Sequence, residues 1–186
     1  MGFETPEKSW IEFARKNRAD AKFHAQAGRR TDACWTISKE AEYEINFIWG
    51  VQPIRERLEV TKRTDYFFSL NSDSNFSFEM YANDFFTRMA LVFNSKKIKI
   101  GNDELDSKYV FISNDKQLAQ SFVGSLKSFV SRNKEMNFLI MTEVGGMKNE
   151  EKRLLIQVNE LLKEEQSIEL FFNLGMELQK AINGKF

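Results

Sequence analysis

Few residues of this chain have the type and spacing that catalysis requires. The chain contains one histidine, His24, and one cysteine, Cys34. A thiol and an imidazole form a nucleophilic pair when the fold brings them together, so a dyad of Cys34 and His24 is the first chemistry to consider. A single cysteine beside Trp35 on a strand is more often an inert core residue. We therefore favour the structural interpretation of Cys34.

Other familiar catalytic and metal sites lack the residues that they need. One histidine excludes a multi-histidine metal centre, and one cysteine with one histidine provides too few ligands for zinc. The chain has no G-x-S-x-G nucleophile elbow, no P-loop and no G-x-G-x-x-G phosphate loop. We expect no metal and no cofactor, and we assign no catalytic residue.

One acidic segment offers a different chemistry. Asp103, Glu104 and Asp106 lie close together in the sequence, and two of these carboxylates could bind a cation or transfer protons. Aspartate is also favoured in loops, where its side chain accepts hydrogen bonds from the backbone. We favour this structural role. An enzyme that uses these carboxylates or Cys34 remains the alternative function.

Aromatic residues are the most unusual feature of the composition. Phenylalanine occurs 18 times, and eight aromatic residues fall between positions 66 and 86, namely Tyr66, Phe67, Phe68, Phe76, Phe78, Tyr81, Phe85 and Phe86. Successive side chains of a strand point to opposite faces, so only about half of these rings can enter one core. The others can line an apolar pocket or an interface, where aromatic residues are enriched, unless a second layer covers them.

The leading hypothesis is therefore a non-enzymatic binding or interaction module. Its aromatic-rich face would bind a protein partner or a small apolar ligand. The candidate binding residues are Phe67, Phe85, Phe86 and Trp49.

Length, charge and cysteine content restrict the remaining classes. The chain has 186 residues, of which 42% are hydrophobic, and this is typical of a single domain that covers residues 1–186. Its 27 basic and 27 acidic residues balance, which argues against nucleic acid as a partner. One cysteine favours a reducing compartment, so we expect a cytoplasmic protein. No apolar run approaches the length of about 20 residues that a membrane span needs.

Hydrophobic periodicity predicts the elements that position these residues. Thr5 and Pro6 are typical of a helix start, and the helix would bury Trp10, Phe13 and Ala14. The stretch from residue 19 to residue 27 can extend this N-terminal helix.

The middle of the chain, residues 34–100, is typical of strands. Phe76, Phe78 and Met80 alternate with polar residues, and the segment NSDSN (71–75) predicts a hairpin turn between a strand that ends near Leu70 and this one. Ile98 and Ile100 indicate another half-buried strand. The apolar run at residues 109–112 predicts a central strand that is covered on both faces.

Two amphipathic helices are expected, at about 114–132 and about 167–183. Asn114 and Gln117 form a predicted capping box for the first, and Gly184 ends the second. The predicted fold class is therefore α+β, a curved and mainly antiparallel sheet of six or seven strands with the N-terminal helix and these two helices. Residues 152–162 fit both a helix and a strand.

The stretch KIGNDELDSKYVFISN, from Lys99 to Asn114, resembles a phrase in a family of uncharacterised bacterial α+β domains. The matching residues are Gly101, Asn102, Asp103, Leu105, Asp106, Tyr109, Val110, Ser113, Asn114 and Asp115. The resemblance covers about residues 98–184. It implies that residues 152–158 form a strand paired with residues 138–141, and it carries no known reaction.

Overall fold

The computed structural model describes residues 7–26, 31–39, 42–54, 57–70, 75–132, 138–144 and 152–184. The strands are β1 (Asp20–Gln26), β2 (Thr31–Lys39), β3 (Tyr43–Ile54), β4 (Arg57–Ser69), β5 (Phe78–Ala82), β6 (Lys97–Ile98), β7 (Tyr109–Ser113), β8 (Phe138–Val144) and β9 (Lys152–Val158). The helices are α1 (Lys8–Lys16), α2 (Phe85–Ala90), α3 (Asp103–Lys108), α4 (Lys116–Ser121), α5 (Val123–Arg132) and α6 (Glu165–Asn183).

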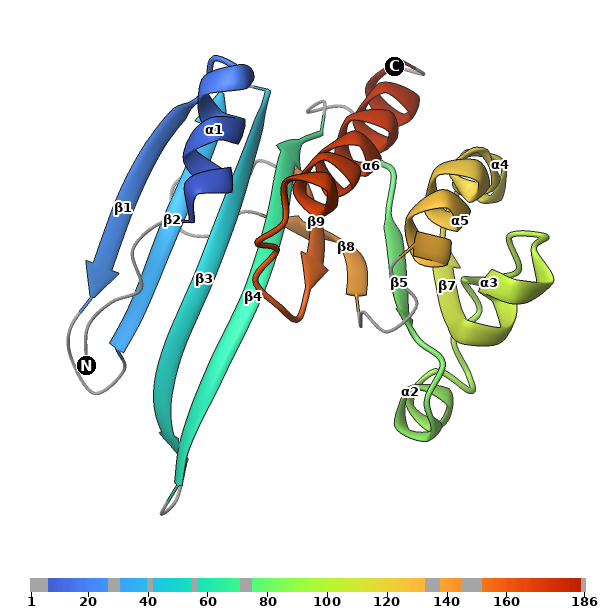
Figure 1. Ribbon diagram of the computed structural model, residues 1–186. Coiled ribbons are helices and arrows are strands. Elements are labelled where there is room, and N and C mark those ends of the chain that lie inside the picture. The colour runs from blue at the N-terminus through green and yellow to red at the C-terminus, as the bar shows by residue number, and fades with distance from the viewer. Residues whose placement is uncertain are drawn as a thin grey trace.

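The nine strands of the described residues form one open sheet in the order β1-β2-β3-β4-β9-β8-β5-β7-β6 (Figure 1). Every pair of neighbouring strands is antiparallel. The α+β class and the antiparallel sheet are confirmed. The prediction of six or seven strands was wrong; one strand that it did not include is β1, because residues 19–27 were assigned to a helical extension.

The hairpin predicted through the NSDSN segment is absent from the sheet. β4 and β5 are not neighbours, because β9 and β8 lie between them; Tyr66 of β4 is opposite Ile156, which is in turn opposite Ile140 of β8. Residues 71–74 of the segment lie outside the described residues. The pairing of residues 152–158 with residues 138–141 is confirmed. Alternation reveals which side chains face the core, but it does not identify the neighbouring strand.

The N-terminal helix is shorter than the sequence pattern allowed. α1 buries Trp10, Phe13 and Ala14 as predicted, whereas the start predicted at residues 5 and 6 lies outside the described residues. Arg18 has a φ of 53°, in the left-handed region that ends helices. The chain then enters β1, so the predicted helical extension over residues 19–27 was wrong.

The stretch predicted as one helix over 114–132 forms two successive helices, α4 and α5, with Phe122 between them. The N-cap of α4 is Asp115, whose carboxylate accepts a hydrogen bond from the Leu118 amide at 2.8 Å. Asn114, the predicted cap, instead accepts a hydrogen bond from the Ser77 amide at 2.8 Å. The last helix, α6, starts at Glu165 rather than at 167, and Gly184 is its C-cap as predicted.

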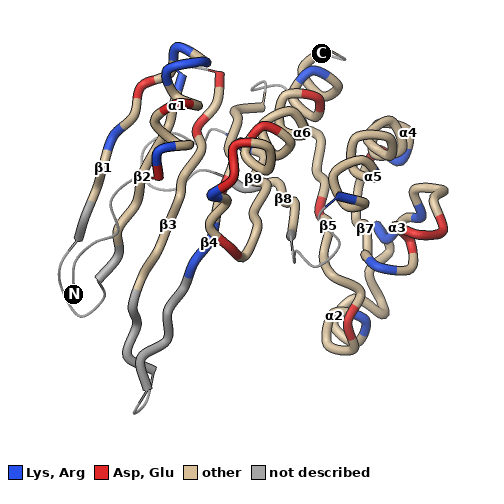
Figure 2. Tube along the Cα trace, viewed as in Figure 1, with Lys and Arg blue, Asp and Glu red and all other residues tan. Residues whose placement is uncertain are grey.

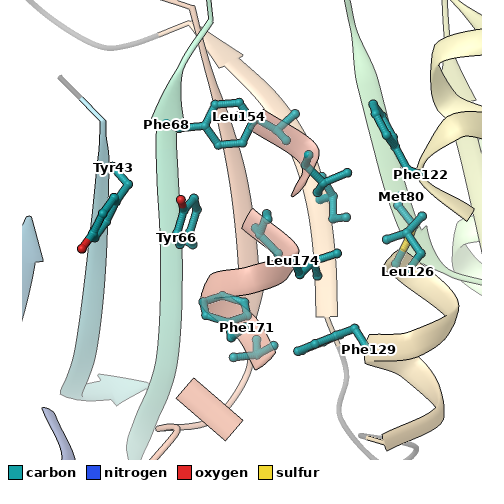
Figure 3. Packing of buried hydrophobic residues seen from close by; sticks show 14 of the residues in the cluster. Tyr43, Tyr66, Phe68, Met80, Phe122, Leu126, Phe129, Leu154, Phe171 and Leu174 are labelled. Carbon is teal, nitrogen blue, oxygen red and sulfur yellow. The ribbon is translucent and has the colours of Figure 1, made fainter. Parts of the chain in front are cut away.

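One side of the sheet carries α1, α6 and the α4–α5 pair, as Figure 1 shows. Tyr109 and Phe111 of β7, whose five residues are all buried, and the alternate residues of the other strands form the core against this helix layer. Trp10 of α1 stacks on Phe47 with ring centroids 4.2 Å apart. At the centre of the core, Phe171 of α6 meets Tyr66 edge-on, with centroids 6.2 Å apart (Figure 3).

Helix α6 lies close to β4 of the sheet at Gly175. A Cβ atom at this position would lie only 2.5 Å from the ring of Tyr66, which is fully buried. Glycine is therefore required at this position by the close approach of helix and strand.

Candidate functional site

The structure separates the aromatic cluster of residues 66–86 into buried and exposed groups. Tyr66, Phe68, Phe76 and Phe78 are buried under the helix layer, whereas Phe67 and Tyr81 are only partly buried. Phe85 and Phe86 are exposed. The expectation that about half of these rings face one core is confirmed.

The four candidate binding residues do not share one surface. Trp49 of β3 lies on the helix side, with its ring centroid 6.3 Å from that of Trp10. Phe67 of β4 points to the opposite face, where the Arg153 guanidinium lies 5.0 Å from its ring centroid. Only Phe85 and Phe86 lie together, on α2, with centroids 5.7 Å apart. The role of all four in binding stays a prediction.

The most exposed apolar surface of the described residues surrounds α2. It consists of Phe85, Phe86, Met89, Val92 and Phe93, and we call these five residues the α2 patch. The relative exposure is 70% for Phe85, 81% for Phe86 and 97% for Phe93. The other exposed large apolar residues, Ile11 and Phe23, belong to α1 and β1.

Sequence reasoning missed three members of the α2 patch, namely Met89, Val92 and Phe93. The signal that could have found them is their spacing. Met89 follows Phe85 by four positions and precedes Phe93 by four, and residues four apart share one face of a helical turn. Asp84 immediately before Phe85 supplies the matching N-cap.

Local hydrogen bonds fix α2 in place. The Asp84 carboxylate accepts a hydrogen bond from the Thr87 amide at 2.7 Å, and this bond lowers the pKa of Asp84. The Leu91 amide donates to the Thr87 carbonyl at 3.0 Å, and the Asn94 amide donates to the Leu91 carbonyl at 3.2 Å. α2 ends at Ala90, and a hydrogen-bonded turn that follows it carries Val92 and Phe93, the last two residues of the patch.

Asn83 anchors the start of α2 to the end of α3. Its backbone amide donates to the Lys108 carbonyl at 2.8 Å, and its side-chain amide donates to the Ser107 carbonyl at 2.9 Å. Its side-chain oxygen accepts a hydrogen bond from Arg88 Nε at 2.8 Å. These hydrogen bonds anchor the helix that carries the patch, although the apolar side chains of the patch are exposed.

The segment that carries the patch is basic. Residues 85–100 contain four basic residues and no acidic one. Figure 2 shows basic and acidic segments next to each other around α2 and α3, because Asp84 and Asp103 flank this stretch. The basic residues are Arg88, Lys96, Lys97 and Lys99, and all four are exposed.

The acidic segment after β6 has a structural role. The Asp106 carboxylate accepts hydrogen bonds from the amides of Ile100, Gly101 and Asn102 at 3.0, 3.1 and 3.2 Å. Gly101 has a φ of 85°, which favours glycine in this turn. Glu104 forms an ion pair with Lys108 at 3.1 Å. No group of three or more His, Cys, Asp or Glu residues in the described part of the chain could hold a metal ion.

The β1–β2 register places His24 directly opposite Cys34. The thiol, however, donates to Asn46 Oδ1 at 3.5 Å and contacts Thr36 Oγ1 at 3.6 Å. Burial raises the pKa of the Cys34 thiol. A nucleophilic cysteine needs a lowered pKa, because the thiolate is the reactive form. Cys34 and His24 thus lie opposite each other on neighbouring strands, but the thiol lacks the lowered pKa that a catalytic cysteine needs.

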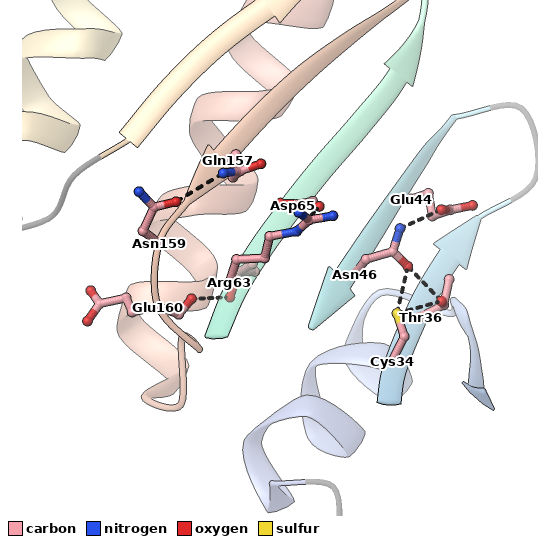
Figure 4. Close-up of polar contacts among 10 residues, drawn as sticks. Cys34, Thr36, Glu44, Asn46, Arg63, Asp65, Gln157, Asn159 and Glu160 are labelled. Carbon is pink, nitrogen blue, oxygen red and sulfur yellow. Dashed lines mark hydrogen bonds and ion pairs between the residues drawn. The ribbon is translucent and has the colours of Figure 1, made fainter. Parts of the chain in front are cut away.

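Cys34 belongs to a polar row on the sheet face that points away from the helices (Figure 4). The Thr36 hydroxyl donates to Asn46 Oδ1 at 2.6 Å, and the Asn46 amide donates to Glu44 at 2.6 Å. On the next strand, Arg63 pairs with the buried Asp65 at 3.0 Å. Cys34 and Thr36 of β2 thus bond to Asn46 of β3 across the strands, whereas the contacts of Glu44 and of Arg63 stay within their own strands. We interpret the row as a structural network.

A shallow groove of about 320 Å³ lies between α5 and α6. Gly124 and Ser128 line it from α5, and Asn173 and Glu177 line it from α6. The Ser125 hydroxyl bridges the two helices by donating to the Glu177 carboxylate. The groove gathers no pair of groups that could perform acid–base chemistry.

Comparison of the chain with protein-family models, curated proteins and solved structures found no match. The resemblance of residues 98–184 to a family of uncharacterised bacterial domains therefore stays a prediction. Among the described residues, no helix has the length and the apolar character needed to cross a membrane.

Proposed function

We propose that this protein is a non-enzymatic binding module that docks through the α2 patch. The exposure of Phe85, Phe86 and Phe93 is the observation that carries the proposal. Contiguous exposed apolar patches mark interaction sites in folded proteins, whereas single exposed apolar residues such as Ile11 are ordinary. The proposal keeps two of the four candidate residues, Phe85 and Phe86, and adds the other members of the α2 patch.

The energetics of α2 support this docking role. Complete burial of one Phe side chain contributes roughly 1.5–3 kcal/mol, and the folded chain gains little of this at α2. A helix of six residues is also too short to be stable by itself. The fold thus holds an ordered helical turn whose apolar side chains face water, and docking is what would bury them.

The alternative function, an enzyme, receives no support from the residues assigned to it. Asp106 is bound to three backbone amides, and burial keeps the Cys34 thiol protonated. Cys34 is a free cysteine. We also propose a cytoplasmic location, because a single unpaired thiol is usual in a reducing compartment.

Site-specific photo-cross-linking tests the docking role. A benzophenone amino acid replaces Phe93 in one variant and Ile11 in a matched control variant, and both are expressed in the native host. We expect adducts, whether with protein or with lipid, at position 93 and few at position 11. Equal yields at the two positions would contradict the proposal. Both side chains are exposed, so neither replacement disturbs the core.

A further inference from the structure

We infer that the α2 patch docks on an anionic lipid surface, with its Phe side chains in the membrane interface and its basic residues against the headgroups. The inference rests on the proposed docking role of the same patch. It goes further by naming the occupant.

The chemistry of the patch favours lipid over protein. All five of its side chains are Phe, Met or Val, which carry no hydrogen-bond donor. Phe and Met are also enriched at protein interfaces, but the residues that contribute most binding energy there are Tyr, Trp and Arg, and the patch itself contains none of these three. A hydrocarbon phase offers no such pairing and selects for side chains of the kind found here.

The size of the patch leads to the same conclusion. A stable protein interface involves roughly 20–30 residues on each side. The α2 patch has five residues, and the other exposed large apolar side chains of the described residues lie on α1 and β1. A membrane interface requires only that an apolar face enter the boundary between headgroups and acyl chains.

The charge around the patch complements an anionic surface. Arg88, Lys96, Lys97 and Lys99 are exposed, and residues 85–100 contain no acidic residue. Of the acidic side chains next to this segment, Asp84 accepts a bond from Thr87, and Asp106 is held by backbone amides. Asp84, Asp103 and Glu104 are exposed as well, and Glu104 pairs with Lys108. The positive charge of the segment is therefore concentrated at Lys96, Lys97 and Lys99, which have no acidic residue between them.

The position of α2 leaves room for such a surface. Figure 1 shows α2 beyond the ends of β5 and β7, apart from the layer formed by α1, α6 and the α4–α5 pair. α2 is anchored to the end of α3 through Asn83, which lies at the start of the helix. Among the described elements, none of the helices of that layer covers α2 in Figure 1, which is compatible with a flat partner.

Vesicle flotation with the purified full chain tests the inference. One set of vesicles contains phosphatidylcholine alone, and the other contains phosphatidylcholine with phosphatidylglycerol. We expect binding to the anionic vesicles that weakens as salt increases. The double variant Phe86→Ser/Phe93→Ser should reduce the partition coefficient about tenfold or more, and the control Ile11→Ser should leave it unchanged.

The contribution of charge is tested separately with Lys96→Gln/Lys97→Gln. Each lost cation should weaken binding to the anionic vesicles about fivefold. Binding that persists in the double Phe variant would overturn the inference, as would the absence of binding to anionic vesicles. If vesicles fail but position 93 forms protein adducts in cells, the occupant is a protein and the docking role stands. If both experiments fail, the docking role fails as well.

Discussion

Aromatic side chains are buried in one region of the molecule and exposed to water in another. Under the helix layer, the rings of Tyr66, Phe78 and Phe171 are fully buried; Tyr66 meets Phe171 edge to face, and Phe78 meets Phe122 in the same way. Beyond the end of β5, the rings of Phe86 and Phe93 project from the surface. Both regions are rich in Phe, so composition does not explain the difference. The rings of the first region pack against other buried residues, whereas those of the second region face water.

This contrast separates the residues that hold the fold from those that are free to bind. A ring on a covered strand face or on the inner face of α6 fills part of the core, so its removal would leave a cavity. A ring of the α2 patch contributes little to folding, because its exposure to water hardly changes when the chain folds. Stability and binding should therefore respond to different phenylalanines.

The largest effect on stability is expected in the covered region. Phe171→Ala removes a fully buried ring that contacts Tyr66 and Phe129, and it should lower the free energy of unfolding by about 3–5 kcal/mol. The matched variant Phe93→Ala should change it by less than about 0.5 kcal/mol. Urea denaturation of both variants measures the difference. Similar losses in the two variants would remove the distinction between the regions.

A smaller loss is expected where α6 meets the sheet. Gly175→Ala places a methyl group 2.5 Å from the fully buried Tyr66 ring and should cost about 1–3 kcal/mol. Gly124→Ala on α5 is the control, because a methyl group there meets no atom within 4 Å. Gly124→Ala should be neutral or stabilising, since alanine favours helix. If urea denaturation gave the same change in the free energy of unfolding for both variants, the short distance between Gly175 and Tyr66 would not restrict the residue at position 175.

The third expected effect is a dependence of the free energy of unfolding on pH. Burial raises the pKa of all four tyrosines, Tyr43, Tyr66, Tyr81 and Tyr109, and for Tyr81 it acts with the hydrogen bond to Glu79 to raise the pKa to about 12. The unfolded chain ionises near pH 10, so the folded state binds these protons more tightly. Their contribution to stability is complete below about pH 10 and is lost as pH rises further.

Tyrosinate absorbance measures this pH dependence directly. The native protein should show little tyrosinate at pH values where the urea-unfolded chain is half ionised, and its ionisation should coincide with unfolding. A tyrosine that ionises near pH 10 in the native protein would contradict the prediction. It would show that its hydroxyl is more exposed to water than the packing of rings such as Tyr43 and Tyr66 indicates.

The sequence allowed the class and the main faces of the fold to be predicted, because these depend on local periodicity. Trp10 and Phe13 in α1, and Phe78 and Met80 in β5, are buried as their spacing predicted. The order of strands depends on contacts between distant segments. Nothing local in β4 shows that β9, rather than β5, lies beside it.

The candidate site was predicted only in part, for a related reason. Phe85 and Phe86 were recognised as surplus rings, but the patch was attributed to a strand-rich face that also included Phe67 and Trp49. Met89 and Phe93 were missed because helical spacing appears only when Asp84 is interpreted as an N-cap. Exposure depends on the absence of a covering element, and that absence is a property of the whole fold.

Whether the α2 patch is covered in the working state of the protein is the most direct test of its docking role. Phe93→Cys and Ile11→Cys, each in a Cys34→Ser background, are labelled with a maleimide in purified form and in an extract of the native host that retains its membranes. We predict equal labelling rates for the two purified variants and strong protection of position 93 alone in the extract. Equal rates at both positions in the extract would contradict the account.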